Sequence, residues 1–173
     1  MKTKQKVDTV INSFLIAIGL ITIVLGILKY SNVKAVFISV MFLYAIFNLL
    51  QFLLTKESKD YEGLYTCLAS LTVGVVDIFF SFDGQNVLAI SLMSWVTMMS
   101  VIKFIKTDYY NDRKDKMWKL RIVLLGLFML IGIVTSMCFN YDENIKVLVL
   151  GYFFLLHGTL ELIDPITKYL IGK

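Results

Sequence analysis

The sequence is poor in the residues from which most active sites are built. Its 173 residues include one histidine and two cysteines, and the motifs HExxH, GxSxG, CxxC and the P-loop pattern are all absent. These motifs mark many metal-dependent, nucleophilic, redox and nucleotide-binding sites. A metal site would also need more ligands than one histidine and carboxylates scattered along the chain. We therefore expect no enzyme, no catalytic residue, no metal and no cofactor.

Strand patterns and helix breakers are scarce as well. Membrane β-barrels alternate apolar and polar residues in segments of about ten residues. Runs such as FLIAIGLITIVLGIL are instead apolar on both phases, and the one proline, Pro165, lies near the end of the last apolar block. These absences argue against a β-barrel.

Apolar residues, in contrast, are abundant and gathered into long blocks. They make up 58% of the chain, and the mean hydropathy is +0.76. About 20 apolar residues in a helix cross a bilayer core that is about 30 Å thick. The sequence thus predicts an all-α, six-helix transmembrane bundle that forms a single membrane domain over residues 1–173. The blocks cover about 9–28, 33–54, 63–82, 86–105, 119–139 and 147–166.

Lysine and arginine are distributed unevenly between the two sides that these blocks define. Fourteen lie on one side and three on the other. The positive-inside rule then predicts a multi-pass protein of the cell membrane with both termini cytoplasmic. The fourteen are Lys2, Lys4, Lys6, Lys56, Lys59, Lys103, Lys106, Arg113, Lys114, Lys116, Lys119, Arg121, Lys168 and Lys173, and the three are Lys29, Lys34 and Lys146.

The same topology bears on partners and cysteines. Cys67 and Cys138 fall near opposite faces of the membrane, so we expect no disulfide between them. The basic residues near block ends alternate with Asp108, Asp112 and Asp115, so nucleic acid is not an expected partner. The first block contains Asn12 and lacks an A-x-A-like cleavage site, so we expect it to be a membrane span and not a signal peptide.

The three short turns on the side with few basic residues resemble one another. Asn32, Asn86 and Asn144 each precede a β-branched residue, at intervals of 54 and 58 residues. An asparagine in this position can cap the start of a helix. Each turn joins two spans into a hairpin, so all three hairpins enter the membrane in the same sense. We predict three parallel repeats, at about 9–54, 63–106 and 118–166.

Polar residues recur at helical spacing within the apolar blocks, and we expect these stripes to face the bundle centre, because lipid offers them no hydrogen-bond partner. The stripes are Asn12, Gly19, Thr22 and Gly26 in the first block, Tyr44, Asn48 and Gln51 in the second, Cys67, Ser70, Gly74, Asp77 and Ser81 in the third, and His157, Glu161 and Asp164 in the sixth. From them we select a candidate intramembrane polar site of Asp77, His157, Glu161, Asn48 and Asn12.

This candidate site has more than one interpretation. Asp77, His157 and Glu161 could form a staggered relay for protons or a small ion, since histidine titrates between pH 5 and 8. Alternatively, the same groups lock helices together through hydrogen bonds. A third interpretation is a subunit that binds lipid, a second copy of the chain or another membrane protein.

The chain resembles the HdeD-like family of small bacterial membrane proteins, which are associated with acid resistance. The resemblance rests on three segments: Val73–Asp77 (VGVVD), Trp118 seven residues ahead of Leu125-Gly126, and Gly158–Leu162 (GTLEL). Family members often carry proline at the outer turns, where this chain has asparagine. The resemblance implies a six-span fold, an inner-membrane location and a non-enzymatic role in stress tolerance.

Overall fold

The computed structural model describes residues 3–30, 32–55, 61–79, 87–112, 117–140 and 142–171, and all elements within them are helical. Six of these helices are long and apolar enough to cross a membrane. The predicted all-α class and the number of spans are thus confirmed. The helices are α1 (Thr3–Ile27), α2 (Val33–Thr55), α3 (Glu62–Phe79), α4 (Val87–Asp112), α5 (Trp118–Met137) and α6 (Glu143–Ile171), with a short 3-10 helix, η2 (Cys138–Asn140), between the last two.

Several helices are longer than the apolar blocks from which they were predicted. Helix α4 continues to Asp112 and α6 to Ile171, although the corresponding blocks end near residues 105 and 166. A hydropathy pattern marks only the apolar part of a helix, whereas backbone hydrogen bonding continues into its polar residues. These polar extensions lie at one end of the bundle.

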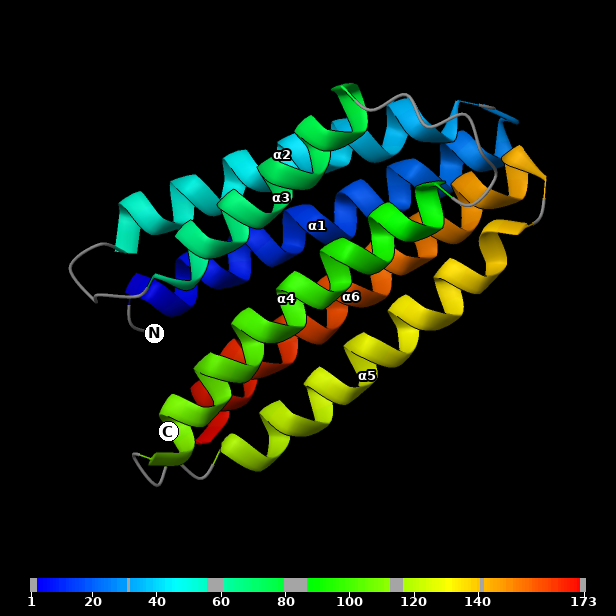
Figure 1. Cartoon of the computed structure of the whole chain (residues 1–173). Helices are drawn as coiled ribbons and strands as arrows, with labels where there is room; N and C mark the ends of the chain where they lie inside the picture. Colours follow the sequence, from blue (N-terminus) through cyan, green and yellow to red (C-terminus); the bar gives the residue numbers. More distant parts are fainter. Residues whose placement is uncertain are drawn as a thin grey trace.

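Successive helices run antiparallel, so the start of α1 and the end of α6 lie at the same end of the bundle (Figure 1). We call this end the charged end, because Glu62, Lys106 and Arg121 lie there. The end at which α1 finishes and α2 begins is called the opposite end.

The helices form a closed ring in the order α1, α6, α5, α4, α3 and α2. Around this ring the closest pairs are α1 with α6, α2 with α3, and α4 with α5. Each of these pairs makes more extensive contact than any pair joined by a short turn. The turn-joined pairs are α1 with α2, α3 with α4, and α5 with α6. A short connection therefore does not mark the tightest contact in this fold.

Glycine explains why these three pairs approach so closely. A β-carbon at Gly19 would lie 2.5 Å from the backbone nitrogen of Leu155 on α6. One at Gly63 on α3 would lie 2.8 Å from a backbone oxygen of α2, and one at Gly132 on α5 would lie 2.8 Å from the side chain of Val96 on α4. Small residues let helix backbones pack closely in a membrane, where no hydrophobic effect drives them together.

The predicted helix caps are confirmed in one of three cases. The Asn32 side chain accepts a 3.0 Å hydrogen bond from the backbone N–H of Ala35, at the start of α2. Asn144 lies inside α6, which begins at Glu143 and whose first hydrogen bonds go to the carbonyl of Asp142, and its side chain is outside what the structure describes. Asn86 lies outside the described residues.

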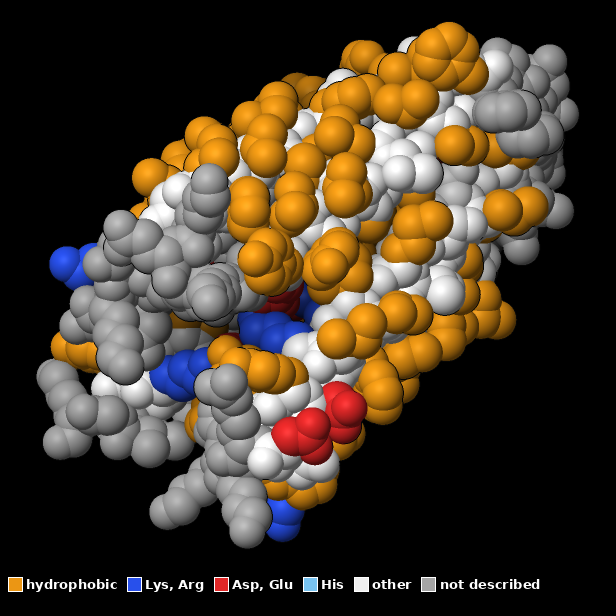
Figure 2. All heavy atoms as spheres, turned by 60° about the vertical axis from the view of Figure 1, so that its left-hand side comes forward, with side chains coloured by type: hydrophobic (Ala, Val, Ile, Leu, Met, Phe, Trp, Pro, Cys, Tyr) orange, Lys and Arg blue, Asp and Glu red, His pale blue; other side chains and the backbone are white. Residues whose placement is uncertain are grey.

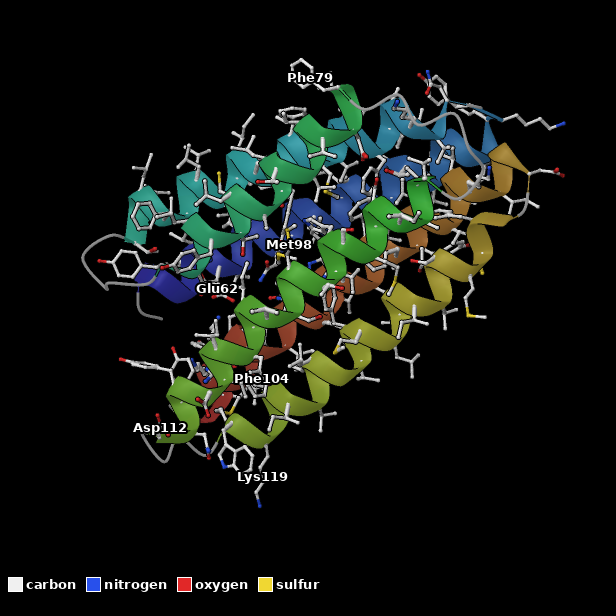
Figure 3. The ribbon with its side chains drawn as sticks, viewed as in Figure 1. Glu62, Phe79, Met98, Phe104, Asp112 and Lys119 are labelled. Atoms are coloured by element: carbon white, nitrogen blue, oxygen red, sulfur yellow. The ribbon has the colours of Figure 1, made fainter. Side chains whose placement is uncertain are left out.

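The interior is largely aromatic and the outer faces are apolar. Trp95, Phe153, Phe154 and His157 are all fully buried. Apolar side chains cover the sides of the bundle in Figure 2, and Figure 3 shows Phe79 pointing away from the bundle at the end of α3. Such an exposed apolar surface suits contact with lipid.

Both cysteines are free, as expected.

Candidate functional site

A polar cavity opens at the charged end of the bundle. Its volume is about 80 Å³, which is room for several water molecules, and all six helices contribute to its wall. Figure 2 shows blue and red side chains in this hollow, framed by apolar ones. Its charged lining residues are Asp8, Glu62, Lys103, Lys106, Arg121, Glu161 and Asp164, and its neutral polar ones are Asn12, Tyr44, Asn48, Gln51, Thr66 and Thr107.

Two lysines on α4 reach into the cavity and pair with carboxylates on different helices. Lys106 binds Glu62 at the start of α3, on the side of that helix that faces α4 (Figure 3). Lys103, three residues earlier and on the same face of α4, binds Glu161 on α6. Since α4 and α6 are not neighbours in the ring, the pair of Lys103 and Glu161 crosses the cavity.

A third ion pair closes the wall between α5 and α6. Arg121 Nε lies 3.1 Å from Asp164 Oδ1, and its Nη2 lies 3.3 Å from Asp164 Oδ2, so the guanidinium binds both carboxylate oxygens. The guanidinium also stacks on Tyr110 of α4, 3.5 Å from the ring centroid. A buried bidentate pair of this kind fixes side-chain geometry.

The single histidine lies at the closed end of the cavity. His157 is 0% exposed, and its Nε2 lies 3.4 Å from Tyr44 Oη. Its Nδ1 has no hydrogen-bond partner, but it lies 3.8 Å from Oε1 of Glu161, one helical turn away. The same oxygen binds Lys103. Glu161 is therefore placed between a cation and an imidazole that compete for one carboxylate oxygen.

An aromatic layer separates this cavity from the other half of the bundle. The Trp95 ring lies 5.6 Å from the His157 ring and 5.9 Å from that of Phe153, measured between centroids. The Trp95 indole N–H donates a 2.9 Å hydrogen bond to Ser70 on α3. Phe154 packs against the same indole and is fully buried. Among the described residues, these buried rings pack in the core beyond the cavity, on the side away from the charged end.

Asp77 lies beyond the aromatic layer, away from the other candidate residues. It accepts a hydrogen bond from the hydroxyl of Ser91, which is one turn before Trp95 on α4. Along α3, Asp77 is two turns past Ser70, or about 10 Å of helix rise toward the opposite end. The structure therefore brings His157, Glu161, Asn12 and Asn48 to the cavity and its closed end, and it does not bring Asp77 there.

The two asparagines of the candidate site bind backbone oxygens. The Asn12 side chain donates a 3.1 Å hydrogen bond to the carbonyl of Glu161, and the Asn48 side chain donates a 2.8 Å bond to that of Tyr44. Asn12 thus ties α1 to α6 beside the ion pair. Both contacts position the cavity wall, to which the two asparagines belong.

Sequence reasoning missed the cations of this site. The charge count assigns all three to the basic membrane border, because Lys103 and Arg121 lie within three residues of the end of an apolar block and Lys106 directly follows one. A signal was nevertheless present: Ser100, Lys103 and Thr107 follow helical spacing and continue a polar face of α4. Among the described residues, no group of three or more histidine, cysteine or carboxylate side chains is arranged to hold a metal ion.

Comparison with known proteins does not place this chain in a family. No family profile, no curated protein and no solved structure matches it. What the fold and the site define is a class: a six-helix membrane bundle with a charged cavity that is open at one end.

Proposed function

We propose that the chain is a multi-pass membrane protein that binds a small polar solute in the cavity at its charged end. The observation that supports this most strongly is the position of Glu161, which lies between Lys103 and His157 at the closed end of the cavity. A carboxylate with two competing partners can change partner when a solute binds. A purely structural ion pair needs no second partner and no cavity.

The charge of the cavity supports a binding role. An ionised group at the centre of a membrane helix costs about 2.5–3.5 kcal/mol even on lenient insertion scales. Seven ionisable groups line the cavity, and Glu161 lies well inside its span, in a chain where apolar packing alone could join the helices. Replacing a buried ion pair by apolar residues is often neutral or stabilising. Stability alone is therefore a poor reason to keep so many charges here.

The orientation is part of the same proposal. The bias of fourteen basic residues against three supports a cytoplasmic position for the charged end. The solute would then reach the cavity from the cytoplasm, and the aromatic layer around Trp95 would prevent it from crossing. In this arrangement the protein binds or senses a cytoplasmic solute, or holds it before a conformational change.

The proposed architecture also includes the three parallel repeats predicted from the sequence. Gly19, Gly74 and Gly132, which correspond in the three repeats, lie against α6, α2 and α4. Each glycine thus faces the second helix of the preceding repeat, counted cyclically. This regularity supports three parallel repeats around a pseudo-threefold axis, with a cavity on that axis.

The resemblance to HdeD-like proteins supplies a physiological context. We propose that solute binding contributes, without catalysis, to tolerance of stress such as acid. A deletion strain that grows as well as its parent across acidic media would contradict this context without affecting the binding proposal.

A proton or ion relay through Asp77, His157 and Glu161 has less support. Its members lie on both sides of the aromatic layer, and Asp77 binds Ser91. A relay would need a path through the fully buried rings of Trp95 and Phe153.

The proposal is tested by thermal shift of the purified full-length protein in detergent. The panel contains glycine, acetate, methylammonium, glycerol and phosphate. A ligand that binds only the folded state raises the midpoint, and we expect at least one of the five to do so. Glu161→Gln should abolish this shift, because it removes the shared carboxylate.

The matched control is Asp112→Asn, which removes an exposed carboxylate of α4 that does not line the cavity. It should keep the full shift. If no solute of the panel shifts the wild-type midpoint, or if both variants lose the shift alike, the proposed function is wrong.

A further inference from the structure

We propose that the solute is a small zwitterion, with one ammonium and one carboxylate group, which binds by inserting between Lys103 and Glu161. This inference rests on the proposed function and names the chemical class of its ligand. It follows from the charge balance of the cavity, from the ion pair that crosses it and from the buried nitrogen of His157.

The charge balance argues against a ligand of one sign. The lining contains four carboxylates and three cationic side chains. A fourth cation, Lys168, lies 3.7 Å from Asp164 and brings the local sum to zero. In a site of low dielectric, a ligand with net charge would leave one charge without compensation, which is strongly unfavourable. A zwitterion leaves the sum unchanged.

The ion pair across the cavity provides both halves of a zwitterion site. The Lys103 ammonium can bind the ligand carboxylate, and the Glu161 carboxylate can accept a hydrogen bond from the ligand ammonium. The pair links helices that are not neighbours in the ring, so it can open without separating two packed helix faces. The Lys103 side chain is 13% exposed and that of Glu161 is 24% exposed, so solute can reach both from the cavity.

His157 supplies a reason for Glu161 to leave Lys103. Its Nδ1 is buried without a hydrogen-bond partner, and it lies 3.8 Å from the Glu161 oxygen that Lys103 binds. When Tyr44 donates its hydroxyl proton to Nε2, the imidazole N–H is on Nδ1 and is directed at Glu161. A small rotation of Glu161 would then satisfy Nδ1 through one oxygen and the ligand ammonium through the other. A buried donor without an acceptor costs about 1–3 kcal/mol, and ligand binding would remove this cost.

The size and remaining lining of the cavity limit the ligand. The free space of the cavity, about 80 Å³, favours a compact molecule. Met99, Leu124 and Leu160 line the cavity beside the charged groups and can contact a short methylene segment. Glycine and β-alanine have the required two charges and are among the smallest molecules of this class.

The test uses tryptophan fluorescence, because one of the two tryptophans adjoins the site. Trp95 lies 5.6 Å from the His157 ring, so its emission should respond to a change at His157. Trp118→Phe leaves Trp95 as the only tryptophan of the full-length protein. This variant, in detergent, is titrated separately with glycine, β-alanine, acetate and methylammonium.

We expect a saturable change of Trp95 emission with glycine or β-alanine. Its dissociation constant should be at least about tenfold lower than that for acetate or methylammonium, a difference of about 1.4 kcal/mol. Lys103→Met and Glu161→Gln should each abolish the change, and Asp112→Asn should leave it intact. The double variant Lys103→Glu with Glu161→Lys keeps an ion pair and should retain binding, because a zwitterion can bind in the reverse direction.

Three results would overturn this inference, and they are distinguishable. If acetate, methylammonium or another solute of the thermal-shift panel binds at least as tightly as the zwitterions and needs Glu161, the ligand class is wrong and the proposed function stands. If none of these solutes binds, both the class and the function are wrong. Zwitterion binding that survives Glu161→Gln would also overturn the inference, because it would place the ligand elsewhere.

Discussion

Trp95 links more helices than any other side chain described above. From α4, its ring contacts Tyr44 on α2, His157 on α6 and Phe128 on α5. Its indole N–H donates to Ser70 on α3. The residue is fully buried. One side chain thus fixes the relative positions of five of the six helices at the closed end of the cavity.

We predict that Trp95→Phe lowers the free energy of unfolding by about 1–3 kcal/mol. The phenyl ring is smaller and cannot donate a hydrogen bond, so the buried hydroxyl of Ser70 loses its donor and a void remains. Unfolding in mixed micelles with increasing denaturing detergent measures the difference. Trp118→Phe, at the partly exposed start of α5, is the control and should change stability little. Equal losses in both variants would contradict this role of Trp95.

The sequence could identify some site residues because a buried polar group in a lipid-facing segment is conspicuous. His157 and Glu161 stand in an apolar run with helical spacing, so their common face was predictable. Lys103 was not, because a lysine close to a span end is equally consistent with a residue at the membrane surface. Only the position of α6 across the ring shows that Lys103 reaches over the cavity to Glu161.

At the level of helices, glycine position decides which surfaces meet. Gly19 is buried against the backbone of α6, whereas a β-carbon at Gly126 would have no atom within 4 Å among the described contacts. Gly126 was part of the resemblance to a known family, but it makes no close helix contact. Two glycines within membrane helices can therefore have different roles, which depend on the helix face on which each lies.

We predict opposite effects for alanine at these two glycines. Gly19→Ala should lower the free energy of unfolding by about 1–3 kcal/mol, because the new methyl group would force α1 and α6 apart. Gly126→Ala should be neutral or raise stability by up to about 1 kcal/mol, because alanine favours the helix more than glycine. Unfolding in mixed micelles compares the two directly. A similar loss in both would show that the contact with Leu155 does not limit the packing of α1.

The helices themselves were predictable, but their pairing was not. Six blocks of about 20 apolar residues specify six spans, since a bilayer has a fixed thickness. Each short turn joins two helices into a hairpin, but the most extensive contacts are those of α1 with α6, α2 with α3, and α4 with α5. Turn length limits only how far apart two helix ends lie. Contact along the whole length of two helices depends on where the small residues are.

At the scale of the whole molecule, orientation is the main prediction. We expect both termini and the cavity to face the cytoplasm. In a background with Cys67→Ala and Cys138→Ala, single cysteines are introduced at two exposed positions, Lys34→Cys at the opposite end and Asp112→Cys at the charged end. A membrane-impermeant thiol reagent should label only Lys34→Cys in intact cells. Asp112→Cys should react after permeabilisation.

The reverse labelling pattern would show that the cavity opens away from the cytoplasm. In that case the charge bias does not determine the orientation, and the solute would come from outside the cell. The geometry of the ion pairs would be unaffected. Labelling of both positions in intact cells would indicate leaky membranes, so an unmodified cytoplasmic protein with reactive thiols is labelled in parallel as a control.

Closure of the ring has a consequence for biosynthesis. The most extensive contact of α1 is with α6, so the first helix to leave the ribosome must wait for the last one. About 115 residues separate the end of α1 from the start of α6, and at about 5–20 residues per second their synthesis takes roughly ten seconds. During this interval, the glycine-lined face of α1 is open to lipid or to other nascent helices. A chain interrupted before its final segment would leave that face uncovered, which gives membrane quality control a simple feature by which to recognise incomplete products.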